Sequence, residues 1–233
     1  MHISKNEKDI VVLVQSRLSS QRCHEKMIRP FAGTTLLDIS LEKLRKSKID
    51  NKNIWCSVYD NKLKNLCREY PFNIHNRSKR SAQSEGKPIT EIFDWWDKIP
   101  AKYVIMVNAC CPFVSIDTIE KFFYDYKESS CTGMFGVVES RDYFWNQDGV
   151  LIAPVENEVM NTKFSQPVLK AAHCLYAGSL DDIGKNIWMG NMAKQNDIKL
   201  WKMNEEEVFD IDYEWEFNLY EELYKQRVLK NEK

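Results

Sequence analysis

The sequence lacks the long apolar runs that membrane proteins require. None of its 233 residues lies in a run approaching the ~20 apolar residues that cross a bilayer. Residues 1–9, MHISKNEKD, contain no apolar core of the kind found in secretory signal peptides. We therefore expect a cytoplasmic protein without a membrane partner.

The chain also lacks an excess of either charge, since its formal net charge is −1. A general nucleic-acid-binding surface needs many cations, so a nucleic-acid partner is not expected, although a local basic site is compatible with this balance. Apolar residues make up 43% and charged residues 29%, an ordinary balance for a globular protein. The length and the absence of linkers or repeats predict one domain over residues 1–233.

Several catalytic and metal-binding motifs are missing. The seven cysteines are odd in number and irregularly spaced, with no C-x-x-C, so we expect reduced thiols rather than disulfides or a structural zinc site. No G-K-[ST] motif is present, which argues against a Walker-type NTPase. No G-x-S-x-G occurs, and Ile28 stands where an H-E-x-x-H motif starting at His24 would need its second histidine.

Residues 9–44 are the stretch around which the chain is organised. An apolar run, Ile10–Val14, leads into a polar loop, and an amphipathic run follows from Leu36 to Leu44. This pattern predicts the first strand of an α/β sheet, a long loop and a helix. The loop carries hydroxyls and cations: Ser16, Arg17, Ser19, Ser20, Arg22, Lys26 and Arg29. Loops at the carboxyl ends of such strands bind ligands, and this composition favours phosphates; a solvent-exposed basic loop is the alternative.

The remaining chain alternates between predicted strands and helices. Strands are expected over residues 53–59, 72–75, 103–107, 131–138, 174–177 and 198–203, and helices over residues 60–70, 88–97, 117–126, 180–186 and 213–228. Residues 76–87 are predicted to form a loop, and residues 140–166 a hairpin or arm outside the sheet. The alternation predicts a mainly parallel sheet. We interpret four tryptophans as packing residues: Trp95, Trp96, Trp188 and Trp201.

Two aspartates near the C-terminus are candidate metal ligands. Asp210 and Asp212 are two residues apart in a segment expected to be extended, so their carboxylates face the same side. Such oxygen ligands suit Mg²⁺ that is also held by substrate phosphates. The alternative is that Asp212 caps the last helix.

Three further positions have competing interpretations. Asn108 follows the central strand, where it either contacts a ligand or ends the strand. Arg77, with Lys79 and Arg80, is either a binding group or part of a solvated charge run. His173 adjoins an apolar strand, and on residue type alone a buried core histidine is favoured.

Three segments carry a family resemblance: VVLVQSRLSSQRCHEKMIRPFAGTTLLDISLEKL, IMVNACCPF and FDIDYEWEFNLYEEL. They resemble the cytidylyltransferases that activate acidic sugars, namely the acylneuraminate (CMP-sialic acid) and CMP-3-deoxy-manno-octulosonate synthetases. The resemblance implies a three-layer α/β sandwich with a mostly parallel, Rossmann-like sheet of the nucleotide-diphospho-sugar transferase type. It also implies a homodimer, with a small dimerisation arm at about residues 140–170.

The resemblance implies a nucleotidyltransferase reaction and a role for each matching residue. An acidic acceptor would attack the α-phosphate of CTP, giving a CMP-linked product and pyrophosphate, in the service of cell-surface polysaccharide synthesis. Arg17, Arg22 and Lys26 would act catalytically on the phosphates. The nucleotide would also contact Ser19, Ser20, Arg77 and Asn108; Mg²⁺ would bind Asp210 and Asp212; and the acceptor would lie near Gln166, His173 and Tyr176.

The chain departs from the family pattern in the loop and after the central strand. Cys23-His24-Glu25 replaces the usual Leu-Pro-Gly, Met27 stands where sialic-acid enzymes usually have Asn, and residues 109–112 lack the usual hydroxyl or acidic groups. These departures bear mainly on the identity of the acceptor. The candidates are a sialic-acid-like sugar acid, a 3-deoxy-2-keto sugar acid and a non-sugar acid such as a phosphonate. Two competing hypotheses are a glycosyltransferase and a non-catalytic nucleotide-binding protein, each of the same fold.

Overall fold

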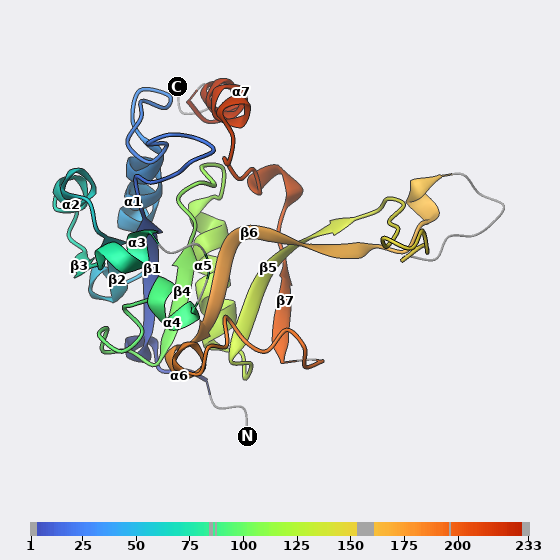
Figure 1. Ribbon diagram of the computed structural model, residues 1–233, viewed down its shortest axis with the longest axis horizontal. Helices are drawn as coiled ribbons and strands as arrows, with labels where there is room; N and C mark the ends of the chain where they lie inside the picture. The colour runs from blue at the N-terminus through green and yellow to red at the C-terminus, as the bar shows by residue number, and fades with distance from the viewer. Residues whose placement is uncertain (1–3, 84–85, 87, 153–160, 196, 230–233) are drawn as a thin grey trace.

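A seven-stranded sheet forms the centre of the molecule (Figure 1). The computed structural model describes residues 4–83, 86, 88–152, 161–195 and 197–229. The strands are β1 (Ile10–Ser16), β2 (Ile54–Val58), β3 (Asn73–Asn76), β4 (Tyr103–Val107), β5 (Gly133–Ser140), β6 (Val168–Ser179) and β7 (Ile198–Lys202). Their order is β3-β2-β1-β4-β6-β5-β7, and only β6 runs antiparallel to its neighbours. The predicted mostly parallel sheet is confirmed.

Helices cover both faces of this sheet. They are α1 (Leu36–Lys46), α2 (Asn61–Cys67), α3 (Lys79–Gln83), α4 (Ile89–Ile92), α5 (Ile116–Lys127), α6 (Leu180–Gly184) and α7 (Glu214–Tyr224), and a short π-helix, Lys225–Leu229, continues α7. Apolar side chains of α1, α2, α5 and α7 join one core, whereas those of α4 and α6 join the other. The result is the predicted three-layer α/β sandwich.

Strand β1 shows why two cores form. Alternate side chains of a strand point to opposite faces. Accordingly, Ile10, Val12 and Val14 belong to the first core, and Val11 and Leu13 to the second. All five side chains are at most 4% exposed. A strand buried on both faces needs a continuous apolar run, which is the pattern that the sequence shows.

The helix N-termini are capped by local polar side chains. Thr35 accepts a hydrogen bond from the Asp38 backbone at the start of α1, and Ser115 does the same for Thr118 at the start of α5. At α7, Glu216 accepts from the backbone nitrogens of Asp212 and Tyr213 at 2.7 and 2.8 Å. The alternative that Asp212 caps the last helix is therefore wrong, because Glu216 reaches back to do so.

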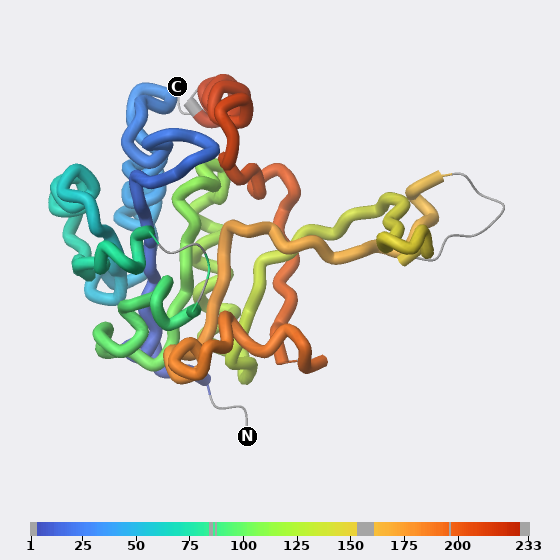
Figure 2. The backbone as a smooth tube through the Cα atoms, in the orientation of Figure 1, coloured from blue at the N-terminus to red at the C-terminus, as the bar shows by residue number. Residues whose placement is uncertain are grey.

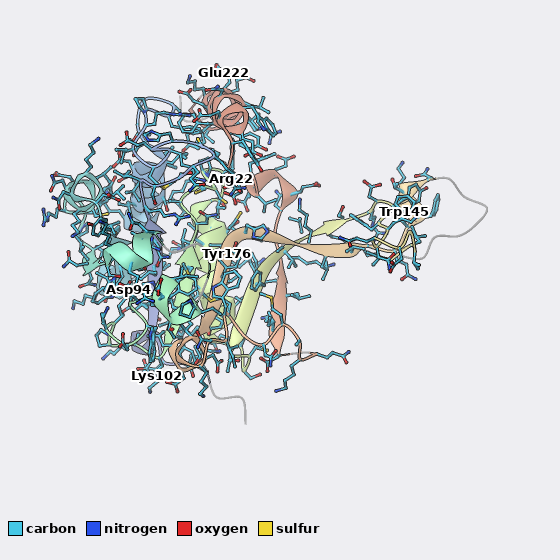
Figure 3. All side chains as sticks on the ribbon, viewed as in Figure 1. Arg22, Asp94, Lys102, Trp145, Tyr176 and Glu222 are labelled. Carbon is cyan, nitrogen blue, oxygen red and sulfur yellow. The ribbon has the colours of Figure 1, made fainter. Side chains whose placement is uncertain are left out.

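A hairpin arm leaves the sheet between β5 and β6 (Figure 2). Trp145 and Leu151 pair across it, and Gly149 adopts a φ of 77° in the turn, which favours glycine. Residues 153–160 of the predicted hairpin or arm lie outside the described residues. Large apolar side chains are exposed on the arm, including Trp145 at 58% and Phe164 at 59% (Trp145 is labelled in Figure 3).

Three predicted segments differ from the structure. Residues 79–83 of the predicted loop form α3, because the backbone and side chain of Ser78 accept hydrogen bonds from Ala82 and Ser81. The predicted helix over residues 88–97 is regular only in α4 and continues as turns. Strand β6 is much longer than the predicted residues 174–177, because it also forms one side of the arm.

The expectations about cysteines and tryptophans are confirmed. The seven cysteines are free, and five of them are buried. Trp95 is fully buried, and Trp96, Trp188 and Trp201 pack against the two cores. Within the described residues, every helix is too short or too polar to cross a bilayer.

Candidate active site

A cleft of about 880 Å³ opens at the carboxyl edge of the sheet. Because β1, β3, β4 and β7 are parallel, the segments that follow them meet at this edge. The long loop after β1, the loop after β3 and Asp212 after β7 all border the cleft. Its lining residues are Gln15, Ser16, Arg17, Ser19, Ser20, Gln21, Arg22, Lys26, Met27, Arg77, Gln83, Gly86, Ile92, Cys110 and Asp212.

The loop after β1 contributes both cations and hydroxyls to the cleft. The Arg17 guanidinium and the Ser19 hydroxyl donate to the Ala82 carbonyl at 3.3 and 3.2 Å, which joins this loop to α3. The Arg22 guanidinium lies 2.8 Å from an Asp212 carboxylate oxygen and remains 54% exposed. All of the hydroxyls and cations that the sequence analysis names in this loop, except Arg29, therefore line one cleft.

Lys26 is the buried cation of this cleft, at 8% exposure. Its ammonium donates to the Ile211 carbonyl and lies 3.2 Å from Asp212 Oδ1. Burial alone would lower the pKa of Lys26, but neighbouring Cys110 and Asp212 raise it overall. Burial also raises the pKa of the Cys110 thiol to about 12, so this thiol is neutral at pH 7 and the ion-pair partner of Lys26 is Asp212. A wholly solvated basic loop is therefore excluded.

Arg77 is a second buried cation, at 5% exposure. Its guanidinium donates to the hydroxyl and the carbonyl of Ser81 at 2.8 and 2.9 Å. Burial and the nearby Arg17 lower the pKa of Arg77 to about 10. No carboxylate forms an ion pair with Arg77 in the described part of the chain. The solvated-run alternative holds for Lys79 and Arg80, which are exposed, but is wrong for Arg77.

The two candidate metal ligands lie close together. Asp212 sits between Arg22 and Lys26 and borders the cleft. Asp210 is half-buried and does not line the cleft; its burial and the charge of Asp212 raise its pKa. No group of three or more His, Cys, Asp or Glu side chains suits a metal ion within the described residues. Two neighbouring carboxylates fit Mg²⁺, which typically takes its other ligands from phosphates and water.

Asn108 joins three elements behind the cleft and does not line it. Its amide nitrogen donates to the His173 carbonyl at 2.9 Å and to Asp210 Oδ1 at 3.4 Å. Its amide oxygen accepts from the Cys110 backbone at 3.0 Å. Asn108 therefore fixes the end of β4 against β6 and Asp210, which matches the strand-ending alternative.

The three candidate acceptor residues are not brought together. The His173 ring and the Tyr176 hydroxyl lie 3.0 Å apart in an irregular part of β6. His173 is exposed and has a φ of 58°, so the core-histidine interpretation is wrong. Gln166 is exposed at the end of the arm, before β6 begins. Neither it nor the His173–Tyr176 pair borders the cleft.

Helix α7 fastens the loop after β1, as the blue and red segments at the top of Figure 2 show. Arg29 pairs with Glu214 at 2.8 Å and stacks on Phe217 at 3.8 Å from the ring centre. Glu221 accepts from the Ala32 backbone at 2.9 Å. Arg29 therefore supports the loop rather than the cleft. Glu25, the acidic departure in this loop, lies 3.4 Å from Lys62 and does not line the cleft.

The sequence interpretation missed Gln15 and Cys110 and assigned no specific contact to Ser16, although all three line the cleft. Gln15 and Ser16 end the apolar run of β1, and polar residues at the carboxyl end of a buried strand are a signal that could have found them. Cys110 carries no such signal, because a cysteine after a strand is ordinarily a packing residue.

Residues 11–172 match the cytidylyltransferase family. The fold is similar to a CMP:2-keto-3-deoxy-manno-octonic acid synthetase complexed with CTP, with a TM-score of 0.69, 11% identity and coverage of 94% of this chain and 100% of that one. It is also similar to a 4-diphosphocytidyl-2C-methyl-D-erythritol synthase from Anaerococcus prevotii. The TM-score is 0.66 and the identity 13%, and the match covers 95% of this chain and 97% of that one. A cytidylyltransferase from Leptospira borgpetersenii matches with a TM-score of 0.60 and 13% identity, over 94% of this chain and 88% of that one. No curated protein matches the sequence.

Proposed function

Because the chain belongs to the cytidylyltransferase family, we propose that it transfers CMP from CTP to an acidic acceptor in a Mg²⁺-dependent reaction that releases pyrophosphate. The observation that carries this proposal is the meeting of three loop cations with a carboxylate in one cleft. Arg17, Arg22 and Lys26 line that cleft together with Asp212. A nucleoside triphosphate needs cations for its phosphates and a carboxylate for its metal ion.

The cations bind the triphosphate and neutralise the charge that develops on the leaving group. The acceptor hydroxyl oxygen forms a bond to the α-phosphorus and loses its proton to water, and the bond from that phosphorus to the bridging β-phosphate oxygen breaks. Pyrophosphate leaves with the bonding electrons. Positioning and charge stabilisation supply most of the catalysis in such a transfer, so no protein nucleophile is needed. Lys26 suits this role because it is held rigidly by Ile211 and Asp212 at the cleft wall.

Asp210 and Asp212 would hold Mg²⁺. When bound, the metal ion supplies charge neutralisation to the phosphates at which the bond breaks. Asp212 can bind the metal ion only if the 2.8 Å ion pair between Arg22 and this carboxylate breaks. That pair is exposed and therefore weak, and the phosphates offer Arg22 a stronger partner.

We propose an acidic sugar, either sialic-acid-like or a 3-deoxy-2-keto sugar acid, as the acceptor. The similarity of the fold to a CMP:2-keto-3-deoxy-manno-octonic acid synthetase supports this proposal. A phosphonate is the alternative acceptor. Family membership disfavours both a glycosyltransferase and a non-catalytic nucleotide-binding protein.

The direct test incubates the protein with CTP, Mg²⁺ and a panel of sialic-acid-like nonulosonates, 3-deoxy-2-keto sugar acids and phosphonates. Pyrophosphate release with one of the sugar acids is the expected result. Release with a phosphonate alone would correct the acceptor class. If no acceptor gave release and calorimetry detected no CTP binding, the proposed function would be wrong.

Replacing Arg17 with alanine is expected to lower kcat/KM for CTP by about 10- to 100-fold, because a charge-assisted contact is worth ~1.5–3 kcal/mol. Steady-state kinetics with varied CTP measures this change. Arg141→Ala is a matched control, because this exposed arginine lies on the arm and pairs with Glu139. Equal kinetics for the Arg17 and Arg141 variants would contradict the phosphate role.

We also propose that the arm mediates a homodimer. Its exposed side chains Trp145, Val150, Ile152 and Phe164 are 58–61% accessible in the single chain, which is costly for large apolar groups. Sedimentation at micromolar concentration is expected to give twice the mass of one chain. Trp145→Ser together with Phe164→Ser should shift the protein to the monomer, and a monomeric wild-type protein would rule out this role.

A further inference from the structure

Gln15 is a polar side chain on the floor of the cleft, at the end of β1. The indole nitrogen of Trp95 donates a hydrogen bond to its amide oxygen at 2.7 Å. Trp95 is fully buried in the core beneath this face of the sheet, so its indole is held firmly. The amide of Gln15 is therefore anchored from below by a core residue.

This anchor decides which atom Gln15 can offer to a ligand. An indole N–H donates and never accepts, so the amide oxygen must face Trp95. Flipping the amide would place two donors opposite each other. The NH₂ group is thus left for other partners, and no described residue accepts a hydrogen bond from it. Since Gln15 borders the cleft, the group available there is a donor of fixed orientation.

The next residue, Ser16, ends β1, and its side chain points to the opposite face of the sheet from Gln15. Ser16 is 3% exposed and lines the same cleft. Its hydroxyl has no hydrogen-bond partner among the residues that the structure describes. This hydroxyl is closed off from the cleft, so at this end of β1 the polar group that can meet a ligand is the Gln15 amide.

The geometry points to Gln15 as a specificity-determining residue that donates its amide N–H to an oxygen of the nucleoside part of CTP, with Trp95 as the positioning residue that fixes the amide. This inference rests on the proposed function, because it needs a nucleotide in the cleft. The loop cations Arg17, Arg22 and Lys26 suit the phosphates, whereas Gln15 is uncharged and lies on the strand itself. Neutral donors in a partly buried floor suit the sugar or base.

The test is calorimetric titration of CTP and, separately, of pyrophosphate. Gln15→Leu is expected to weaken CTP binding about 5- to 10-fold and to leave pyrophosphate binding within twofold, which corresponds to one lost hydrogen bond. Gln15→Glu should weaken CTP binding further, because the carboxylate keeps an acceptor for Trp95 but replaces the donor with a negative charge that repels the ligand oxygen. Trp95→Phe should weaken CTP binding about threefold by freeing the amide.

The double variant tests the positioning role. Trp95→Phe in the Gln15→Leu background is expected to cause no further loss, because Trp95 acts through Gln15. Trp201→Phe is the matched control: its indole nitrogen also donates at 2.7 Å, to Asp125, but away from the cleft, so CTP binding should not change. Melting temperatures show that each variant is folded.

Three results would overturn the inference. They are unchanged CTP binding in Gln15→Leu, an equal loss for CTP and pyrophosphate, or additive losses in the double variant. Absence of CTP binding by the wild-type protein would instead contradict the proposed function itself, and the inference with it.

Discussion

Replacing Asp212 with asparagine is expected to lower turnover by about 10³-fold or more while the protein stays folded. A bound metal ion supplies several kcal/mol of charge stabilisation, and an amide is a poor substitute for a carboxylate ligand. The substitution also removes the pairs with Arg22 and Lys26 at 2.8 and 3.2 Å. Because the Asp212 side chain is 34% exposed, we expect the free energy of unfolding to fall by only about 1 kcal/mol.

Pyrophosphate release and Mn²⁺ binding, followed by the paramagnetic signal of the free ion, measure these effects. Asp9→Asn is a matched control: Asp9 also forms a 2.8 Å ion pair, with Lys102, and its side chain is 30% exposed. It lies just before β1, at the opposite end of that strand from the cleft. Normal turnover in Asp212→Asn, or equal losses in both variants, would contradict the metal assignment.

Replacing Lys26 with methionine should lower kcat by about 10²–10³-fold. Removing one preorganised donor from a developing negative charge has an effect of this size, and Lys26 is the most buried of the three loop cations. Methionine keeps most of the packing of the lysine stem. The Ile211 carbonyl and Asp212 each lose a partner, so we also expect a loss of about 1–3 kcal/mol in the free energy of unfolding.

Lys5→Met separates this catalytic loss from the structural one. Lys5 is as buried as Lys26, at 8% exposure, and its ammonium likewise donates to backbone carbonyls, those of Tyr126 and Ser129. It does not line the cleft, so Lys5→Met should destabilise the protein to a similar extent without changing kcat. Equal kcat values for the two variants would show that Lys26 is a structural residue only.

The fold was predictable where short-range patterns decide the structure. The apolar runs of β1 and β4 are buried on both faces, and such runs have few alternatives. Strand β6 was predicted too short, because its first half is amphipathic and exposed within the arm. Helix α3 was missed because a contact between Arg77 and Ser81 stabilises a polar segment that has no apolar period.

The site was predictable for residues whose chemistry is visible in the sequence. Clustered cations after β1 and paired aspartates after β7 indicated a phosphate and metal site, and Arg17, Arg22, Lys26 and Asp212 do share a cleft. Burial and long-range pairing were not visible. In the sequence Arg29 belongs to the same run of loop cations, but its position is set by Glu214, which is 185 residues away.

The fastening of the loop by α7 has a consequence for protein synthesis. The ribosome makes the loop early, but the glutamate that accepts from Ala32 comes 189 residues later. Likewise, the hydrogen bond from Lys26 to the Ile211 carbonyl cannot form until residue 211 has been made. A growing chain is therefore expected to remain unable to order its nucleotide cleft until α7 has emerged, so that the cell gains this activity only from chains whose translation has reached the last helix.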